Sequence, residues 1–283
     1  MYFSINAYAK INWCLHITGV LENGYHEMDM LMQPISLCDT LEFRDSQVLS
    51  LTVNGQPANE NDLVLKAARA LKAVADNETL GAKIALKKRI PARAGLGGGS
   101  ADCAETLKAL NRMWKLNLSM ENLLQIGAKL GADVPFCLTG GLARVSGFGE
   151  KVVRLKAAPH CALVLITPGG GLSTPEVFRE WDAQPSALKD TENSVESLAD
   201  ALIRSNFEAA QALSFNALEA PAVRLMPEIE KWMQAFRDCG AKYVRMSGSG
   251  STVYGVFDSL KEAQAVAARY SGAVAAQTIT QSV

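Results

Sequence analysis

Four glycines within five positions, Gly95 and Gly97 to Gly99, constrain this sequence more than any other feature. Before them, Ala82 to Ile90 alternate small or apolar with polar side chains, which is the period-two pattern of a half-buried strand. After them, apolar residues recur at helical spacing from Cys103 to Trp114, so we expect a helix to begin near Ser100, a good N-cap residue. The segment therefore predicts a strand, a glycine-rich loop and a helix in succession.

A glycine-rich loop that leads into a helix is suited to binding phosphate. Glycine adopts backbone angles closed to other residues and lets a ligand approach the main chain. At the start of a helix, unpaired N–H groups and the positive end of the helix dipole meet at one point. The Ser100 hydroxyl would either cap the helix or face a phosphate oxygen or a metal. A flexible linker or a plain helix cap is the alternative, but a cap needs fewer glycines.

Two familiar phosphate loops do not match this segment. A Walker loop requires a Lys and then a Ser or Thr after the glycines, and no Lys follows them here. The dinucleotide-binding fingerprint requires a final Gly where this chain has Ser100, followed by a further parallel strand. Here the next predicted element is another helix, over Met120 to Gly131 with Ser119 as its N-cap. The predicted loop is therefore a phosphate site of another kind.

Composition limits the class of protein. The 283 residues allow two domains or one large one, and 48% hydrophobic with 20% charged residues is typical of a globular protein with a substantial core. The formal net charge of -1 gives no sign of a nucleic-acid-binding surface. The N-terminal residues MYFSINAYAKIN lack the pattern of a signal peptide, and no apolar run reaches the roughly 18 residues of a membrane span. We expect a cytoplasmic protein.

The cysteines and histidines indicate neither disulfides nor a resident metal. Six cysteines are scattered along the chain without a CxxC pair and read as reduced core residues (Cys14, Cys38, Cys103, Cys137, Cys161 and Cys239). The three histidines, His16, His26 and His160, are too few and too dispersed for a His-based metal centre. We therefore predict no protein-held metal site.

The N-terminal part of the chain predicts strands and a turn. Ile5 to Ile17 reads as a strand in which Lys10 and Asn12 share one face, about 7 Å apart. They suit an anionic or hydroxylated ligand, although Lys10 taken alone fits a solvated side chain better. Asn23-Gly24 predicts a turn, which places Tyr25 and His26 at a loop edge. Two shorter strands are expected at Asp29 to Leu37 and Thr40 to Phe43.

Two further stretches carry chemistry-bearing residues. Asp133 has apolar neighbours in a segment expected to be extended, and it is either a helix-end hydrogen bonder or a functional carboxylate. A second glycine loop, Ser247 to Ser251, lies between two predicted strands and also fits a tight hairpin. Cys161 to Thr167 predicts a buried strand, and Phe207 to Leu218 predicts a helix among others in this half. The whole pattern indicates an α+β protein with a boundary near residue 157.

Three segments in order, YAKIN, PARAGLGGGSAD and MSGSGSTVYGVF, resemble the motifs of the GHMP kinase superfamily. The segments NGYHEM, LGADVPFCLTGG and LSTPEVF narrow the resemblance to the members that act on a cytidine-diphosphate-linked alcohol. It implies a first domain like the second domain of ribosomal protein S5, which binds ATP (1–157), and a ferredoxin-like domain, which binds substrate (158–283). It also implies ATP- and Mg²⁺-dependent phosphorylation of the tertiary 2-hydroxyl of a cytidine-diphosphate-linked methylerythritol.

The resemblance assigns roles to individual residues. Lys10 matches the catalytic lysine and Asp133 the catalytic aspartate, which would accept the hydroxyl proton while Lys10 stabilises charge. Substrate positions are matched by Asn12, Tyr25, His26, Thr174 and Phe178, with Tyr25 and Phe178 stacking on cytosine and His26 hydrogen bonding its edge. Nucleotide positions are matched by Lys88, Pro91, Ala92, Arg93, Ala94, Gly95, Leu96, Gly97, Gly98, Gly99, Ser100, Ala101 and Asp102. The family usually has Gly where this chain has Arg93.

Two alternatives stay open at this point. Another kinase of the superfamily would phosphorylate homoserine, mevalonate or a sugar. A nucleotide-binding module without activity would use the same glycine loops as a sensor, although the presence of both Lys10 and Asp133 argues against it.

Overall fold

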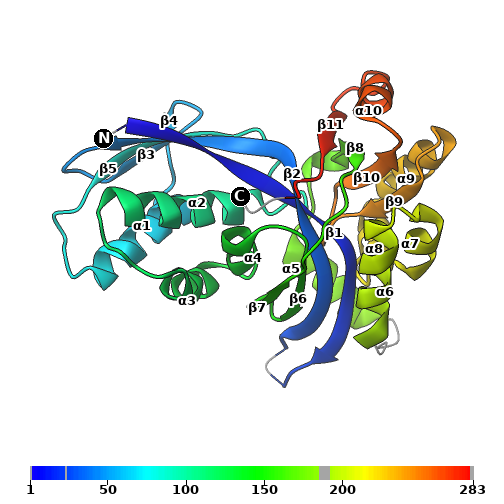
Figure 1. The fold of residues 1–283 in the computed structure, drawn as a ribbon, viewed down its shortest axis with the longest axis horizontal. Coiled ribbons are helices and arrows are strands. Elements are labelled where there is room, and N and C mark those ends of the chain that lie inside the picture. The colour runs from blue at the N-terminus through cyan, green and yellow to red at the C-terminus, as the bar shows by residue number, and fades with distance from the viewer. Residues whose placement is uncertain (1, 23, 185–191, 281–283) are drawn as a thin grey trace. The chain divides into compact units, whose positions relative to one another are not determined.

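The computed structural model describes residues 2–22, 24–184 and 192–280, which form two compact units (Figure 1). The first unit comprises Met1–Ala9, Leu37–Ile90 and Gly97–Thr139, and the second comprises Lys10–Ser36, Pro91–Leu96 and Gly140–Val283. The long strands β1 (Tyr2–Val20) and β2 (His26–Asp45) each contribute to both units. A single cut at residue 157 does not reproduce these units, and the division into an ATP domain and a substrate domain stays a prediction.

The first unit is a sheet covered by helices. The C-terminal half of β2 pairs with β5 (Ala82–Lys87), which pairs in turn with β3 (Ser50–Val53), and β4 (Gln56–Pro57) forms the edge. Figure 1 shows the helices on one face of these strands: α1 (Leu63–Val74), α2 (Gly98–Met113), α3 (Met120–Leu130) and α4 (Val134–Thr139).

Alternation along β5 decides which face meets the helices. Ala82, Ile84 and Leu86 are buried, whereas the residues between them are exposed. The apolar stripe of α1 and the buried face of α2 complete this core, in which Leu71 and Leu107 are fully buried. The core therefore fixes the start of α2, where the glycine-rich loop ends.

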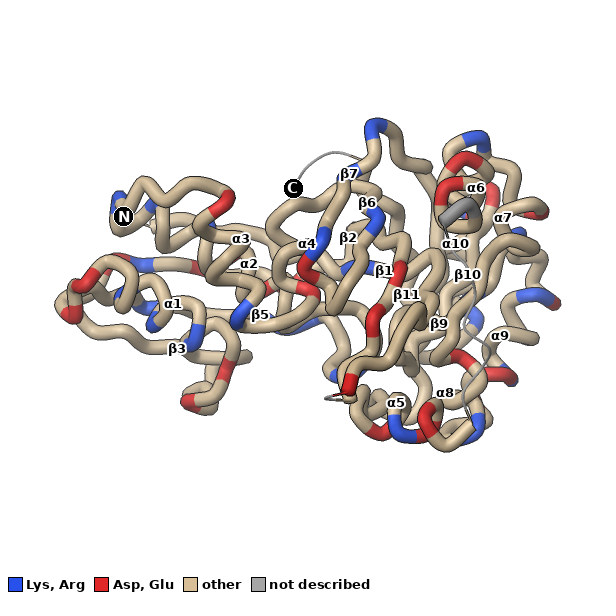
Figure 2. Tube along the Cα trace, turned by 90° about the horizontal axis from the view of Figure 1, so that it is seen from below, with Lys and Arg blue, Asp and Glu red and all other residues tan. Residues whose placement is uncertain are grey.

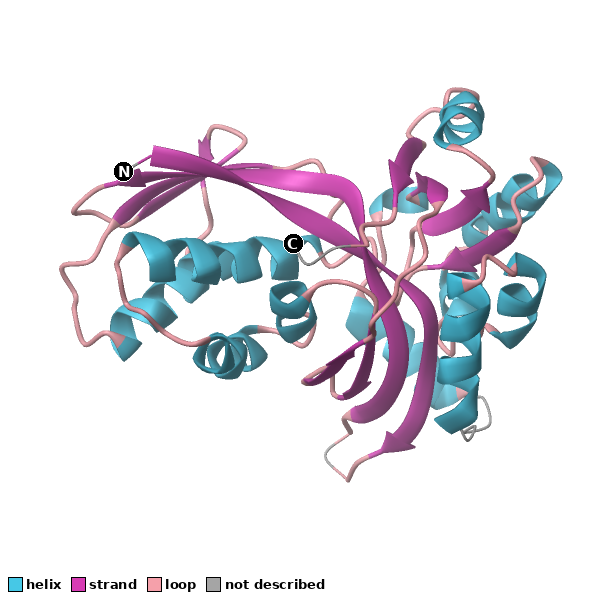
Figure 3. Cartoon of the chain, in the orientation of Figure 1, coloured by secondary structure: helices cyan, strands magenta, loops and turns pink. Residues whose placement is uncertain are grey.

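The second unit contains an antiparallel sheet in the order β11-β8-β10-β9 (Figure 3). Its strands are β8 (Ala162–Ile166), β9 (Tyr243–Met246), β10 (Val253–Phe257) and β11 (Val274–Gln277). The hairpin of β6 (Ala143–Gly147) and β7 (Lys151–Arg154) pairs with the N-terminal half of β2. Helical segments follow β8: η1 (Pro168–Gly170), α5 (Thr174–Ala183), α6 (Glu192–Ile203), α7 (Phe207–Leu213), α8 (Glu219–Leu225), α9 (Glu228–Asp238) and α10 (Leu260–Ala267).

Most expected elements are confirmed, including the first strand, the helix that begins at Met120 and the α+β class. Ser119 caps α3 and forms a reciprocal capping box with Asn122. The turn at Asn23-Gly24 is only partly described, because Asn23 lies outside the described residues.

Four expectations about elements were wrong. β2 is continuous where two strands were expected, because the residues around Cys38 and Asp39 keep an extended backbone. Gly97, not Ser100, caps α2. Asp133 leads directly into α4 and not into an extended segment. The helix expected up to Leu218 ends at Leu213, and the residues after it pair with β1 before α8 begins.

Charges are mixed along the chain. Figure 2 shows Lys and Arg interspersed with Asp and Glu in both units. Within the described ranges, no helix has the length and apolar character needed to cross a membrane.

Candidate functional site

The start of α2 has the geometry of an anion site. Its N-cap, Gly97, has a φ of 66°, and no side chain caps the helix. A β-carbon at Gly98 would lie 2.9 Å from the Ile90 Cγ2, whereas one at Gly99 would meet only the Leu63 Cδ1, at 3.5 Å. The leading N–H groups of this 16-residue helix are therefore not occupied by a side-chain cap, and the helix dipole adds positive potential there.

The preceding segment of the loop, Pro91–Leu96, is held by its backbone within the second unit. The φ of Arg93 is 53°, a left-handed conformation that explains why glycine suits this position. Gly95 has a φ of 73°, and a β-carbon on it would lie 2.0 Å from the Ser247 carbonyl oxygen. Three carbonyls of the segment accept N–H groups from elsewhere in the unit: Arg93 from Leu172 (2.9 Å), Ala94 from Thr252 (3.2 Å) and Leu96 from Lys10 (2.9 Å).

Lys88 and Asp102 belong to a buried charged cluster in the first unit. The Lys88 ammonium donates to Asp102 (2.7 Å) and to Asp39, and Asp39 also accepts the Ile90 N–H at 2.9 Å. Asp39 is fully buried and Asp102 is 2% exposed, and the second carboxyl oxygen of Asp102 has no hydrogen-bond partner. A β-carbon at Gly98 would lie 3.4 Å from the Lys88 Nζ, so the cluster lies beside the start of α2. Sequence reasoning missed Asp39.

The electrostatics of this cluster follow from its burial. Burial raises the pKa of Asp102 to about 7, the attraction of Lys88 opposes that rise, and the nearby Asp39 carboxylate adds to it. For Lys88, burial works to lower the pKa, but Asp102 and Asp39 together raise it above its ordinary value. Lys88 therefore stays a cation, while Asp102 titrates near neutral pH.

Lys10 and Asn12 contact each other and the second glycine loop. Both are buried, and the Lys10 ammonium donates to the Asn12 Oδ1 at 2.7 Å, so the predicted shared face is confirmed. The interpretation of Lys10 as a solvated side chain is therefore wrong. The Asn12 N–H donates to the Ser247 Oγ (3.2 Å), and a β-carbon at Gly248 would lie 3.3 Å from the Lys10 Nζ. The loop Ser247–Ser251 is thus part of the Lys10 environment and more than a hairpin turn.

Asp133 is half-buried and immediately precedes α4, whose Cys137 N–H donates to its carbonyl at 3.0 Å. Lys10 and Asp133 belong to different units, so their meeting at one reaction centre stays a prediction.

An aromatic cluster surrounds His26 in the second unit. The His26 ring lies 4.7 Å from that of Phe178 and 5.4 Å from that of Trp181 (centroids), and its Nε2 lies 2.7 Å from the Asp182 Oδ1. Tyr25 is 65% exposed. The structure therefore brings His26 and Phe178 together, whereas a cytosine sandwich between Tyr25 and Phe178 stays a prediction.

Sequence reasoning missed Trp181 and Asp182, although helical spacing offered a signal. They lie three and four residues after Phe178 on α5 and therefore share its helix face. Another predicted substrate residue, Thr174, forms a hydroxyl–hydroxyl hydrogen bond of 2.8 Å with Ser249. The first residue of α5 is thereby tied to the second glycine loop.

No three His, Cys, Asp or Glu side chains gather as a metal site within residues 2–22, 24–184 and 192–280. Burial raises the pKa of Cys14, Cys103 and Cys161 to about 12, so these three remain thiols at neutral pH.

Comparison with known proteins supports the family that the motifs indicate. Residues 62–141 match the GHMP kinases N terminal domain, and residues 198–276 match the GHMP kinases C terminal domain. A 4-diphosphocytidyl-2-C-methyl-D-erythritol kinase of Pelotomaculum thermopropionicum is 41% identical over 93% of this chain and 92% of its own length. The protein of that name from Bacillus subtilis is 36% identical over 88% of this chain and 86% of its own length.

Solved structures agree with this assignment. The crystal structure of a 4-(cytidine 5'-diphospho)-2C-methyl-D-erythritol kinase superposes with a TM-score of 0.84 at 34% identity, covering 98% of this chain and 99% of that one. A homoserine kinase from Cytophaga hutchinsonii shares the fold alone, with a TM-score of 0.74 at 18% identity, covering 100% of this chain and 97% of that one. The expected two-domain architecture is confirmed. The chain therefore belongs to the GHMP kinase family and is a small-molecule kinase.

Proposed function

We propose that this kinase transfers the terminal phosphate of ATP to the 2-hydroxyl of 4-diphosphocytidyl-2-C-methyl-D-erythritol, a step of the non-mevalonate route to isoprenoid precursors. The observation that carries the proposal is the 41% identity with a relative of that name over 93% of the chain. The residues that the motifs assign to such a substrate are all present, among them Lys10, Asn12, His26, Asp133 and Phe178.

The uncapped start of α2 supports a role as the triphosphate cradle. Phosphoryl transfer needs little covalent chemistry from the protein; it needs the acceptor in line and the charge neutralised. The N–H groups of Gly98, Gly99 and Ser100 would donate to phosphate oxygens, and the half-buried Lys88 would add a positive charge beside Gly98. The first turn holds no acidic residue that would repel a nucleotide.

The aromatic cluster supports recognition of a flat base. His26 is supported by Phe178, Trp181 and Asp182, so its imidazole is oriented before a ligand arrives. A carboxylate such as Asp182 accepts from Nε2, so in the tautomer that carries its hydrogen there, Nδ1 would accept from an amino group such as that of cytosine. Stacking of the base on Tyr25 or Phe178 would contribute about 1–3 kcal/mol per ring, by analogy with other base–aromatic contacts.

Lys10 and Asp133 would act on the reacting hydroxyl. Asp133 would accept its proton, a contribution typically worth roughly 10²–10⁴-fold in rate. Lys10, already oriented by its hydrogen bond to Asn12, would orient the hydroxyl and stabilise developing negative charge. Binding energy from the distant cytosine would hold the tertiary hydroxyl in line with the phosphate.

The residues fit Mg²⁺ that arrives with the nucleotide. Magnesium is commonly held by substrate phosphates with few protein ligands, and no three-residue cage exists within the described ranges. Bound there, it would neutralise charge on the phosphates, while the chain's own part would be the helix start and Lys88.

The test is direct. The protein is incubated with Mg-ATP and the cytidine-linked alcohol, and the product is analysed by mass spectrometry for the gain of one phosphate. Homoserine and mevalonate serve as competing acceptors. Phosphorylation of either, with none of the cytidine-linked alcohol, would contradict the proposed substrate; ATP binding with no product on any acceptor would contradict catalysis. A cytoplasmic location, expected from the sequence, belongs to the same proposal.

A further inference from the structure

The second glycine loop, Ser247–Ser251, is held from behind by a buried asparagine that no motif assignment covers. Asn216 is 6% exposed and donates both amide hydrogens to main-chain carbonyls, those of Met246 (3.0 Å) and Gly248 (2.9 Å). Its Oδ1 accepts the Leu218 N–H at 3.0 Å. These two hydrogen bonds hold the main chain on both sides of Ser247, where the loop begins.

Asn216 is itself fixed on β1. The Leu15 N–H donates to the Phe215 carbonyl, and the Leu15 carbonyl accepts the Ala217 N–H, each at 2.8 Å, so the backbone around Asn216 runs parallel to β1. This is the strand that carries Lys10 and Asn12 five and three residues earlier. The asparagine therefore links the strand that carries Lys10 and Asn12 to the second glycine loop.

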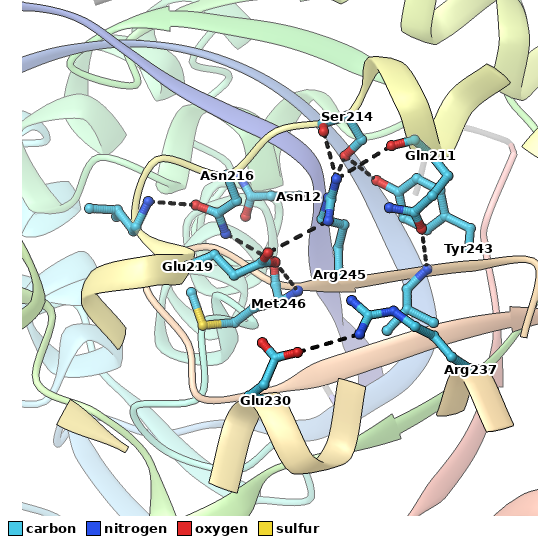
Figure 4. Close-up of polar contacts among 12 residues, drawn as sticks. Asn12, Gln211, Ser214, Asn216, Glu219, Glu230, Arg237, Tyr243, Arg245 and Met246 are labelled. Carbon is cyan, nitrogen blue, oxygen red and sulfur yellow. Dashed lines mark hydrogen bonds and ion pairs between the residues drawn. The ribbon is translucent and has the colours of Figure 1, made fainter. Parts of the chain in front are cut away.

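A charged pair supports the other side of the same loop entry. Glu219 accepts the Met246 N–H at 3.1 Å and lies 3.5 Å from the Arg245 guanidinium. Arg245 in turn donates to the Ser214 hydroxyl (2.9 Å) and carbonyl (2.6 Å). Figure 4 shows Asn216, Glu219 and Arg245 gathered around Met246. The Met246 carbonyl and N–H are thus bonded to Asn216 and Glu219, both of which follow α7 in the chain.

The loop that Asn216 holds packs against the reacting lysine. A β-carbon at Gly248 would meet the Lys10 Nζ, the Asn12 Oδ1 and the Gly95 carbonyl oxygen, each at 3.3 Å. The Ser247 hydroxyl donates to the Gly95 carbonyl (2.9 Å). A shift of Gly248 would therefore displace the Lys10–Asn12 pair and the first glycine loop together.

We infer that Asn216 is a positioning residue for phosphoryl transfer: by fixing the carbonyls of Met246 and Gly248, it sets the loop against which Lys10 and Asn12 are oriented. The inference rests on the proposed function, because it assigns Lys10 to the transfer step. Asn216 contacts no reacting group, and its effect passes through the Gly248 backbone.

The experiment compares Asn216→Asp with Asn111→Asp. Asn111 makes a similar pair of backbone bonds, donating to the Leu118 carbonyl and accepting the Leu118 N–H, each at 3.0 Å, away from both glycine loops. In Asn216→Asp a carboxylate would face two carbonyls and could not donate to them. We expect kcat to fall about 10–100-fold while the KM values for ATP and the acceptor stay within about threefold, since small misplacements reduce turnover strongly. Asn111→Asp should keep the parent kcat.

Hydrogen exchange of the peptide spanning 246–252 gives a readout that does not depend on activity. Exchange in this peptide should accelerate in Asn216→Asp and stay as in the parent in Asn111→Asp. If Asn216→Asp does not fold, Asn216→Ala, which introduces no charge, takes its place. If neither folds, the asparagine supports the whole unit and the inference is wrong.

The outcomes separate this inference from the proposed function. If the parent is active and Asn216→Asp has the same kcat, the inference is wrong and the proposed function stands. No turnover by the parent would overturn the proposed function, and unchanged exchange in the 246–252 peptide would then overturn the inference as well.

Discussion

The two glycine-rich loops share a composition but differ in what holds them. The loop before α2 ends at a helix start that no side chain caps. The loop Ser247–Ser251 is tied by its own polar atoms to Asn216, Asn12 and Gly95, and Ser247 and Ser251 are fully buried. The comparison teaches that glycine serves two purposes here. In the first loop, Gly95 lets the backbone approach the Ser247 carbonyl, and the glycines at the start of α2 are proposed to leave room for phosphate. In the second loop, Gly248 and Gly250 lie against the side chains of Lys10, Asn12 and Met246.

The largest effect is expected at Gly95, where the loops touch. Alanine there would place a β-carbon 2.0 Å from the Ser247 carbonyl oxygen at a φ of 73°. Strain at positive φ and overpacking each cost about 1–3 kcal/mol, so Gly95→Ala should lose roughly 2–5 kcal/mol of stability and all measurable turnover. Chemical denaturation and a phosphorylation assay measure both.

Gly99→Ala is the control for that prediction. Gly99 is helical and exposed, and its added β-carbon would make only an ordinary contact with Leu63. Stability should rise by up to about 1 kcal/mol, because alanine favours a helix over glycine. Equal destabilisation of the two variants would show that the contact between Gly95 and Ser247 does not distinguish the loops.

The next largest effect is expected at Lys10 and Asp133, the two residues proposed to act on the reacting hydroxyl. Lys10→Ala and Asp133→Ala should each reduce turnover at least about a hundredfold while the protein stays folded. Steady-state kinetics together with circular dichroism measure this. Near-normal turnover in Asp133→Ala would remove the proposed base, and near-normal turnover in Lys10→Ala would leave the second loop without a catalytic partner.

A smaller effect is expected at Gly248, on the side of the second loop that meets Lys10. Alanine there would be strained at a φ of 57° and would press on Lys10, Asn12 and Gly95 at 3.3 Å, distances that small side-chain shifts relieve. Gly248→Ala should therefore cost about 1–2 kcal/mol of stability and lower kcat about tenfold. A loss of ATP affinity with unchanged kcat would instead indicate that this loop, like the first, binds the nucleotide.

The smallest effect concerns the charged cluster under the first loop. The pKa of Asp102 is raised to about 7 from an ordinary 3.8, so the folded state binds more protons than the unfolded state between these values. This group therefore stabilises the fold at acid pH, and its contribution is lost as pH rises towards 7. Asp102→Asn does not titrate, so from pH 5 to 8 the variant should gain about 1–2 kcal/mol relative to the parent. Denaturation at both pH values measures the difference, and a constant difference would contradict the raised pKa.

Local pattern was sufficient for most of the fold and for part of the site. Alternation predicted β1 and β5, and helical spacing predicted α2 and α3, because each pattern follows from which neighbours in the chain are apolar. The prediction that Lys10 and Asn12 share a face needed only the strand period. The true cap of α2 was missed, because the left-handed angle at Gly97 depends on how the loop is anchored at both ends.

By itself, the sequence determined the α+β class, the glycine-rich loop between a strand and a helix, the family motifs and the local pairing of Lys10 with Asn12. Only the tertiary structure decided that β2 is continuous, that Asp39 holds Lys88 under the loop, and that Asn216 and Asp182 support Gly248 and His26. Asp39 precedes Lys88 by 49 positions, Asn216 precedes Gly248 by 32, and Asp182 follows His26 by 156. Contacts over such separations depend on chain topology, which the periodicity of neighbouring residues does not encode.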